Sequence, residues 1–100
     1  MLNTIAAGQT DQALSKISGT TTGTTGDRLD YVLIIPASTS PGAVTIKDGN
    51  GAAVTIFAGG SSSVATLHPF TVPVGEASKA GGWKLTTGAN VSAIAFGNFT

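Results

Sequence analysis

The chain has 100 residues, of which 14 are glycine and only 10% are charged, and five basic and five acidic residues give a formal net charge of zero. Nucleic-acid binding needs a basic patch and binding to anionic membranes needs clustered Lys or Arg, so the composition argues against both partners. The absence of cysteine excludes disulfide scaffolds and thiolate metal sites. A near-neutral, charge-poor surface favours association, as in a protein built into an assembly.

Residues 1–28 are predicted to form an extended N-terminal arm. Their Thr/Gly-rich segment SGTTTGTTGD disfavours a helix, although TDQALSKI allows a short helix capped by Thr10 or Asp11 as well as a short strand. The composition of the arm cannot make an independent core, so we expect it to lie across a neighbouring subunit. Its deletion is then expected to weaken assembly and to leave the body folded.

Two kinds of targeting segment are not indicated by the sequence. The N-terminal residues lack both a positive region and a continuous apolar core, which indicates synthesis in the cytoplasm without a secretory signal. No apolar run approaches the length of a membrane span.

Residues 29–100 are predicted to form a β-rich body. LDYVLII (29–35) is a strand with apolar residues on both faces, and AVTIKDGNGAAVTIFAG contains a hairpin that turns at Asp48-Gly49. HPFTVPVG contains two prolines and is typical of an edge strand. Short strands joined by Gly, Pro and Ser turns predict a single small all-β sandwich, either jelly-roll-like or immunoglobulin-like. The expected core consists of Leu33, Ile35, Val44, Ile46, Val54, Ile56, Phe70, Val72, Trp83, Leu85, Ile94 and Phe96.

The closing segment VSAIAF (91–96) also has two apolar faces. We expect Ile94 and Phe96 to point into the core, and the small Ala93 and Ala95 to pack against the arm or another subunit. Phe99 is the leading candidate for a contact between subunits. The full set of candidate interface residues is Leu2, Ile5, Leu14, Ile17, Tyr31, Ala93, Ala95 and Phe99.

Few residues carry catalytic or ligand-binding chemistry. His68 is the single histidine, and no nucleophile motif accompanies it. Asp48 and Asn50 have the spacing of a calcium loop, but no bidentate Glu follows them, so a hairpin turn is favoured. Trp83 is in phase with Leu85, which favours a core position over a sugar-stacking platform. We therefore expect no enzyme activity, no cofactor and no metal site.

The segments GDRLDYVLIIPASTSPGAVTIKDG, PFTVPVG and GGWKLTTGANVSAIAFGNF resemble the head decoration (cement) proteins of tailed bacteriophages, over about residues 26–99. The resemblance implies a virion protein on the capsid exterior that contacts the major capsid protein and assembles as a homo-oligomer, either trimer or dimer. The alternative is a tail- or fibre-associated module that binds host surface glycans, which an exposed Trp83 would favour. A free-standing adhesin would need an export signal.

Overall fold

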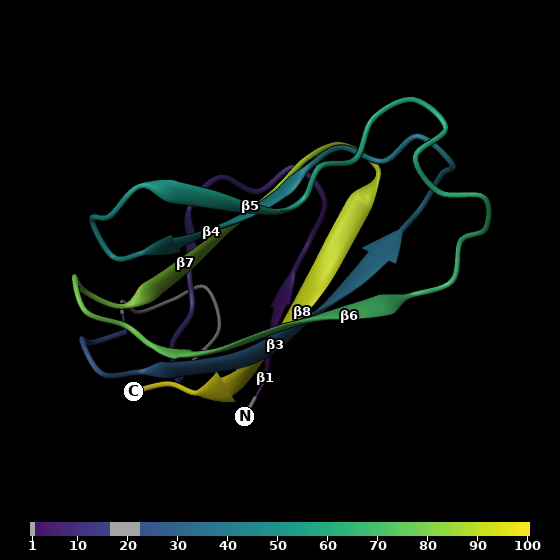
Figure 1. The fold of residues 1–100 in the computed structure, drawn as a ribbon. Helices are drawn as coiled ribbons and strands as arrows, with labels where there is room; N and C mark the ends of the chain where they lie inside the picture. Colours follow the sequence, from purple (N-terminus) through teal and green to yellow (C-terminus); the bar gives the residue numbers. More distant parts are fainter. Residues whose placement is uncertain (1, 17–22) are drawn as a thin grey trace.

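The computed structural model describes residues 2–16 and 23–100, and the regular structure in this part of the chain is entirely β. Two four-stranded antiparallel sheets pack face to face, with the strand orders β1-β8-β3-β6 and β2-β7-β4-β5 (Figure 1). The described residues include no helix that could cross a membrane. The eight strands are β1 (Leu2–Ile5), β2 (Gln12–Ala13), β3 (Arg28–Pro36), β4 (Val44–Asp48), β5 (Ala53–Phe57), β6 (Phe70–Ala77), β7 (Trp83–Thr87) and β8 (Val91–Asn98).

The strands pair in a nested order. The first strand pairs with the last, and the following pairs are β2 with β7, β3 with β6, and β4 with β5. This is the order of a jelly roll, in which a long antiparallel hairpin folds over to make two sheets. The predicted β-sandwich is confirmed, and of the two types that the sequence left open the structure has the jelly roll.

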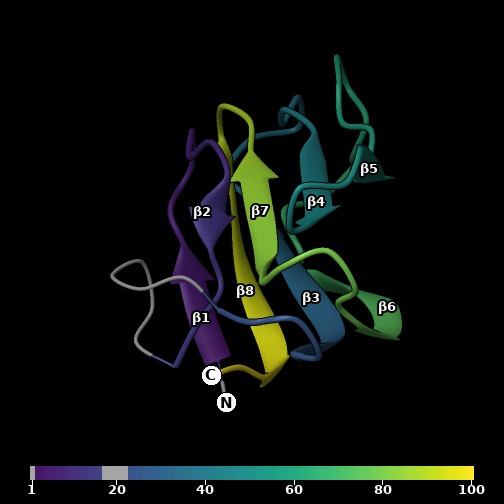
Figure 2. The same ribbon diagram turned by 90° about the vertical axis from the view of Figure 1, so that its left-hand side faces the viewer.

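The N-terminal segment belongs to the sandwich, which corrects its description as an arm outside the body. β1 pairs with β8 in one sheet and β2 pairs with β7 in the other, so the segment closes one side of the molecule (Figure 2). Ile5 and Leu14 are buried in the common core. The side chain of Asn3 links β1 to the residues just after β2, because its Nδ2 donates to the carbonyl of Ser15 at 3.0 Å and its Oδ1 accepts from the amide of Ser15 at 3.3 Å. The apolar residues of the N-terminal segment, Ile5 and Leu14, need no separate core because they complete the core of the body.

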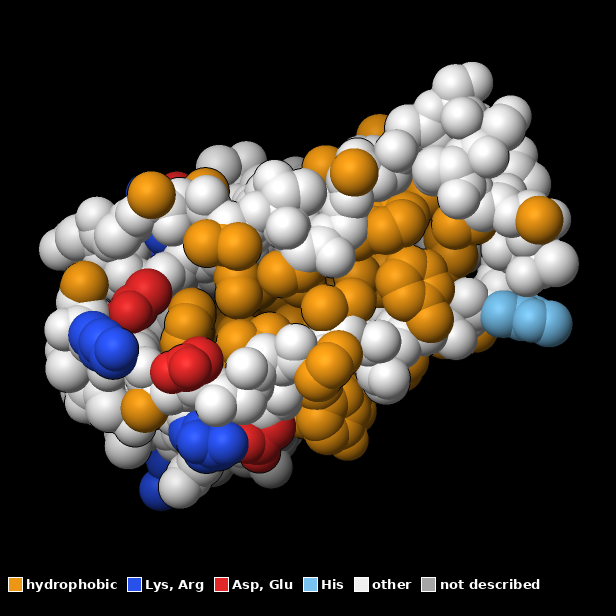
Figure 3. Space-filling view, in the orientation of Figure 1, with side chains coloured by type: hydrophobic (Ala, Val, Ile, Leu, Met, Phe, Trp, Pro, Cys, Tyr) orange, Lys and Arg blue, Asp and Glu red, His pale blue; other side chains and the backbone are white. Residues whose placement is uncertain are grey.

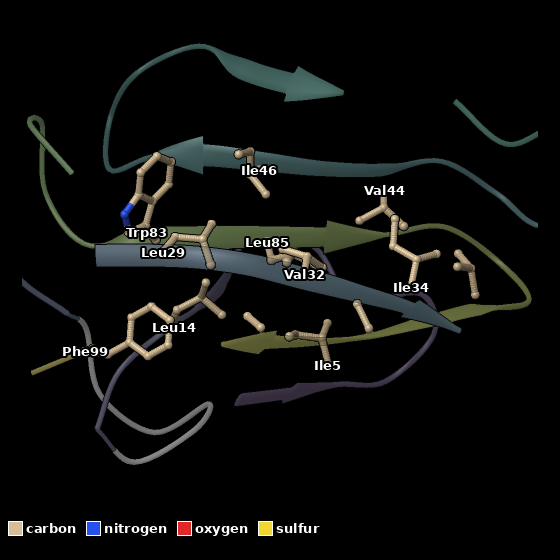
Figure 4. Packing of buried hydrophobic residues seen from close by; sticks show 13 residues of the cluster. Ile5, Leu14, Leu29, Val32, Ile34, Val44, Ile46, Trp83, Leu85 and Phe99 are labelled. Carbon is tan, nitrogen blue, oxygen red and sulfur yellow. The ribbon is translucent and has the colours of Figure 1, made fainter. Parts of the chain in front are cut away.

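The core lies between the inner faces of the two sheets (Figure 4). Val44, Ile46, Trp83 and Leu85 are buried as predicted, and Ile56, Phe70 and Val72 pack against them while partly exposed. Val54 is 56% exposed, so its core assignment is wrong. It lies on an edge strand where the two sheets do not cover each other.

The two strands with two apolar faces have the opposite orientation to the predicted one. On β8 the buried positions are Ala93 and Ala95, whereas Ile94 and Phe96 point outward and are half-buried. On β3 Ile34 is the buried position, whereas Leu33 and Ile35 point outward and are half-buried. When both faces of a strand are apolar, the alternation of side chains does not show which face is buried. The space between the sheets is filled mainly by larger side chains from β3, β4 and β7.

The C-terminal residues are fastened to the body, and Phe99 is buried at 1% exposure rather than available to a partner. The buried Asp27 holds this end: its Oδ2 accepts from the amide of Thr100 at 3.2 Å and its Oδ1 from the hydroxyl of Thr100 at 2.9 Å. Its Oδ2 also accepts from the amide of Thr24 at 3.0 Å, and its carbonyl accepts from Nε1 of Trp83 at 2.9 Å. Asp27 thus connects the loop before β3, the start of β7 and the end of the chain.

Gly97 on β8 is expected to tolerate no side chain. A methyl group there would collide with the carbonyl oxygen of Arg28 on β3 and would approach the Phe99 ring to 3.0 Å. We expect Gly97→Ala to lower the free energy of unfolding by about 2 kcal/mol, the usual cost of overpacking, as measured by urea denaturation. The control is Ser92→Ala at an outward position of the same strand, expected to change stability by less than about 0.5 kcal/mol. Equal stability of the two variants would contradict this close packing of β3 and β8.

Candidate interaction surface

An apolar row crosses the outer face of the β1-β8-β3-β6 sheet. The pairing register places Leu2 beside Phe96, Phe96 beside Tyr31, and Tyr31 beside Pro73, so the row reaches all four strands. A second row begins with Ile94 beside Leu33, and Ile35 lies beyond it. We call the set of Leu2, Tyr31, Leu33, Ile35, Ile94 and Phe96 the outer apolar face.

A bulge in β3 brings Tyr31 to this face. In the pairing of β3 with β8, Leu29 lies opposite Gly97 and Tyr31 lies opposite Phe96, so Asp30 is an extra residue on β3. Without the extra residue, Leu29 and Tyr31 would share a face because side chains alternate along a strand. Instead Leu29 is buried in the core, Tyr31 is 39% exposed on the outside, and Val32 returns to the core.

The two aromatic residues of the outer apolar face, Tyr31 and Phe96, stack against each other. The ring centroids of Tyr31 and Phe96 are 4.6 Å apart, with 18° between the ring planes. Each ring therefore covers one face of the other. A sugar-binding platform needs an open ring face, so this arrangement suits packing against another protein better than stacking on a glycan.

The charged groups nearest to this face lie at one end. Nε of Arg28 and Oδ1 of Asp30, both about half exposed, form an ion pair of 2.8 Å at the beginning of β3. The remainder of the face carries the apolar rows, flanked by Thr4 and Thr71 at their edges. A partner could therefore cover the centre of the sheet without stripping water from a charge.

The predicted interface residues divide into two groups. Leu2, at 53% exposure, and Tyr31 are accessible on the outer apolar face. Ile17 lies outside the described residues. The other predicted residues are buried in the core of the same chain and offer no surface to a partner: Ile5, Leu14, Ala93, Ala95 and Phe99. Sequence reasoning missed Leu33, Ile35, Ile94 and Phe96, whose only signal was their place in two-faced apolar strands.

A second apolar region lies on the side of the sandwich opposite β1 and β2, where β5 and β6 are the outermost strands. Apolar side chains line the opening between the two sheets there (Figure 3). Phe57 and Phe70 meet across it edge to face, with ring centroids 5.3 Å apart. We call this region, made by Val54, Ile56, Phe57, Phe70 and Val72, the open side.

The residues considered for chemistry have structural roles or stand alone. Trp83 is 6% exposed and plugs the core as predicted. The carbonyl of Asp48 accepts from the amide of Gly51 at 2.7 Å, which closes the predicted turn, and its carboxylate accepts from the amides of Lys79 at 2.9 Å and Ala80 at 3.1 Å in the loop after β6. His68 is exposed in the loop before β6. No pocket and no cluster of three metal-ligating side chains is found among residues 2–16 and 23–100.

No family model, no curated protein and no solved structure matches the chain. An assignment of function therefore depends on the residues and surfaces of the chain itself. The two features available to it are the outer apolar face and the open side.

Proposed function

We propose that the protein is a capsid decoration (cement) protein, which binds the outer surface of a phage head and stabilises it through protein–protein contacts. The observation that carries the proposal is the outer apolar face, whose first row of Leu2, Phe96 and Tyr31 reaches the fourth strand of the sheet beside Pro73. Contiguous apolar surface of this kind on a water-soluble protein marks an interaction site. The partner is the major capsid protein, as the sequence resemblance implies.

The size of the face fits attachment in many copies. Four strands spaced about 4.8 Å apart and about six residues of strand length give a footprint on the order of 400 Å². A stable complex of two proteins usually buries about 800 Å² on each partner. One copy would therefore bind weakly, and an array of copies on a closed shell gains the avidity that a single copy lacks.

Glycan binding by a tail or fibre module has less support. That function was expected to show an exposed Trp83, but the indole is buried and its Nε1 donates to the carbonyl of Asp27. Jelly rolls occur in both viral capsid and lectin domains, so the fold alone favours neither function. The self-stacked Tyr31 and Phe96 favour a protein partner.

The proposal is tested by co-sedimentation of the purified protein with capsid shells from a panel of tailed bacteriophages. We expect saturable binding, and we expect Tyr31→Lys to weaken it at least about 10-fold because a charge would be buried at the centre of the contact. The matched control is Leu67→Lys, which places the same charge at a loop residue that is 49% exposed. Absence of binding to every shell, or equal loss in both variants, would refute the proposal.

A further inference from the structure

We infer that Asn50 is a site of spontaneous covalent modification. The amide nitrogen of Gly51 attacks the side chain of Asn50, which loses ammonia and becomes aspartate or isoaspartate. The site lies in the turn between β4 and β5, in the sheet that does not carry the outer apolar face. This modification uses a motif that the proposed function leaves unused, and it does not depend on capsid binding.

The turn of residues 48–51, DGNG, contains two pairs in which a short acidic or amide side chain precedes glycine. Glycine has no Cβ to obstruct the approach of its own nitrogen to the preceding side chain. The structure holds the first pair, because the carboxylate of Asp48 accepts from the amides of Lys79 and Ala80. The side chain of Asn50 is exposed and has no hydrogen-bond partner among residues 2–16 and 23–100. Only the second pair therefore has a side chain that is free to react.

The reaction needs water and hydroxide but no catalytic group of the protein. Hydroxide removes the amide proton of Gly51, and the nitrogen forms a bond to Cγ of Asn50 within the same chain. The bond from Cγ to Nδ2 breaks, and the leaving nitrogen takes a proton from water to become ammonia, which restores the hydroxide. Water then opens the cyclic imide at one of its two carbonyls. Opening at one carbonyl gives aspartate, and opening at the other gives isoaspartate.

The hydrogen bonds of the turn control the rate of this reaction. The amide of Gly51 donates to the carbonyl of Asp48 at 2.7 Å, so this bond must open before the nitrogen can attack. The amides of the two preceding residues are held as well, by the carbonyls of Gly82 at 3.0 Å and Ala80 at 3.1 Å. Exposed turns open locally at a lower free energy than core strands. We therefore expect the folded chain to react, but more slowly than the unfolded chain.

The other three asparagines of the chain lack this combination of features. Asn3 is buried, and both polar atoms of its side chain are hydrogen-bonded. Asn90 and Asn98 are exposed, but each is followed by a bulky residue that is buried in the core. Asn50 alone has a free side chain and a glycine after it, so the structure assigns the modification to one position.

The two products change the turn in different ways. Both add a carboxylate, which changes the formal net charge from zero to −1. Isoaspartate also adds a methylene group to the main chain, in a turn whose three successive amides are all hydrogen-bonded. The longer main chain cannot keep all three bonds in place. We therefore expect isoaspartate to loosen the turn from the loop of residues 78–82.

Peptide mapping by mass spectrometry, after incubation of the purified full chain at mildly alkaline pH, tests the site. We expect the peptide that contains residue 50 to give two products with the mass of an acid, while Asn90 and Asn98 stay unchanged. Gly51→Ala should slow the conversion at least about 10-fold, because the added methyl group obstructs the attacking nitrogen. This methyl group would lie 3.0 Å from the carbonyl oxygen of Asp48, which a small shift of the turn relieves. The control is Ala52→Ser, at an exposed position next to the pair, which should not change the rate.

Several outcomes of this experiment would overturn the inference. They are an Asn50 that stays intact in the folded chain while the denatured chain is converted, conversion of Asn90 at the same rate, and a rate that Gly51→Ala does not lower. The first two are measured on the unmodified sequence, so they hold even where Gly51→Ala does not fold. A folded chain that reacts as fast as the denatured chain would contradict the control of the rate by the turn.

Hydrogen exchange of the separated isoaspartyl product tests the loosening of the turn. The matched control is the variant Asn50→Asp, which carries the same charge on a main chain of normal length. We expect the amides of Gly49 and Gly51 to exchange at least about 10-fold faster in the isoaspartyl product than in this variant. Equal exchange in the two proteins would show that the added methylene group leaves the turn in place.

Discussion

Deletion of residues 1–16 is expected to unfold the protein rather than to release a folded body. Ile5 and Leu14 are buried at 1% and 0% exposure, and truncation of such residues costs about 2–5 kcal/mol each. The deletion also exposes the free edges of β8 and β7, and it removes the hydrogen bonds of Gln9 and Leu14 to β7. The total is comparable to the about 5–15 kcal/mol by which a domain is usually stable.

Circular dichroism and thermal unfolding of residues 17–100 would check this expectation. The control is Leu2→Ser in the full chain, a change in the same strand at a side chain that is 53% exposed, and it should retain a cooperative transition. If the shortened chain unfolds cooperatively at a temperature near that of the full chain, then β1 and β2 are dispensable and the N-terminal segment is an arm after all.

Asp27→Ala is expected to lower the free energy of unfolding by about 4 kcal/mol. The variant leaves the amides of Thr24 and Thr100 without their carboxylate acceptor in a site where Asp27 is 3% exposed. A hydrogen bond to a charged group contributes about 1.5–3 kcal/mol, and unsatisfied donors add a desolvation cost. Loss of the contacts to Thr100 should also release Phe99 from the core, so the C-terminal residues should become sensitive to carboxypeptidase.

The control for this variant is Asp30→Ala, which removes the same side chain three residues along the chain. Asp30 is exposed and pairs with Arg28 at the surface, and such ion pairs contribute about 0–1 kcal/mol. Urea denaturation measures both variants, and carboxypeptidase digestion followed by mass spectrometry reports on the C-terminus. Equal stability of the two variants would show that the buried carboxylate does not hold the end of the chain.

The sequence carried enough local information to predict the strands and the turn at Asp48. β-branched residues, prolines and Asp-Gly each act on the neighbouring backbone, so their effect is visible in a short window. The in-phase spacing of Trp83 and Leu85 likewise predicted a core position that the structure confirms.

The strands β1 and β2 could not be recognised in the same way. Their stability comes from pairing with β8 and β7, more than 70 residues away, and not from local preference. The candidate surface was missed for a related reason. Only the pairing of β3 with β8, together with the bulge at Asp30, decides that Leu33, Ile94 and Phe96 lie outside and Ala93 inside.

The nested order of the strands has a consequence for the timing of folding. Among the residues that the structure describes, β1 pairs with β8 alone and β2 with β7 alone, so these two N-terminal strands can pair only after the two C-terminal strands of the sandwich have been made (Figure 1). Contacts between such distant residues slow folding, because the closure of a long loop must precede any gain from pairing. Until residue 98 has left the ribosome, the apolar inner surface of the nascent chain stays open to solvent and to chaperones. Closure of the sandwich therefore has to follow the release of β8 from the ribosome.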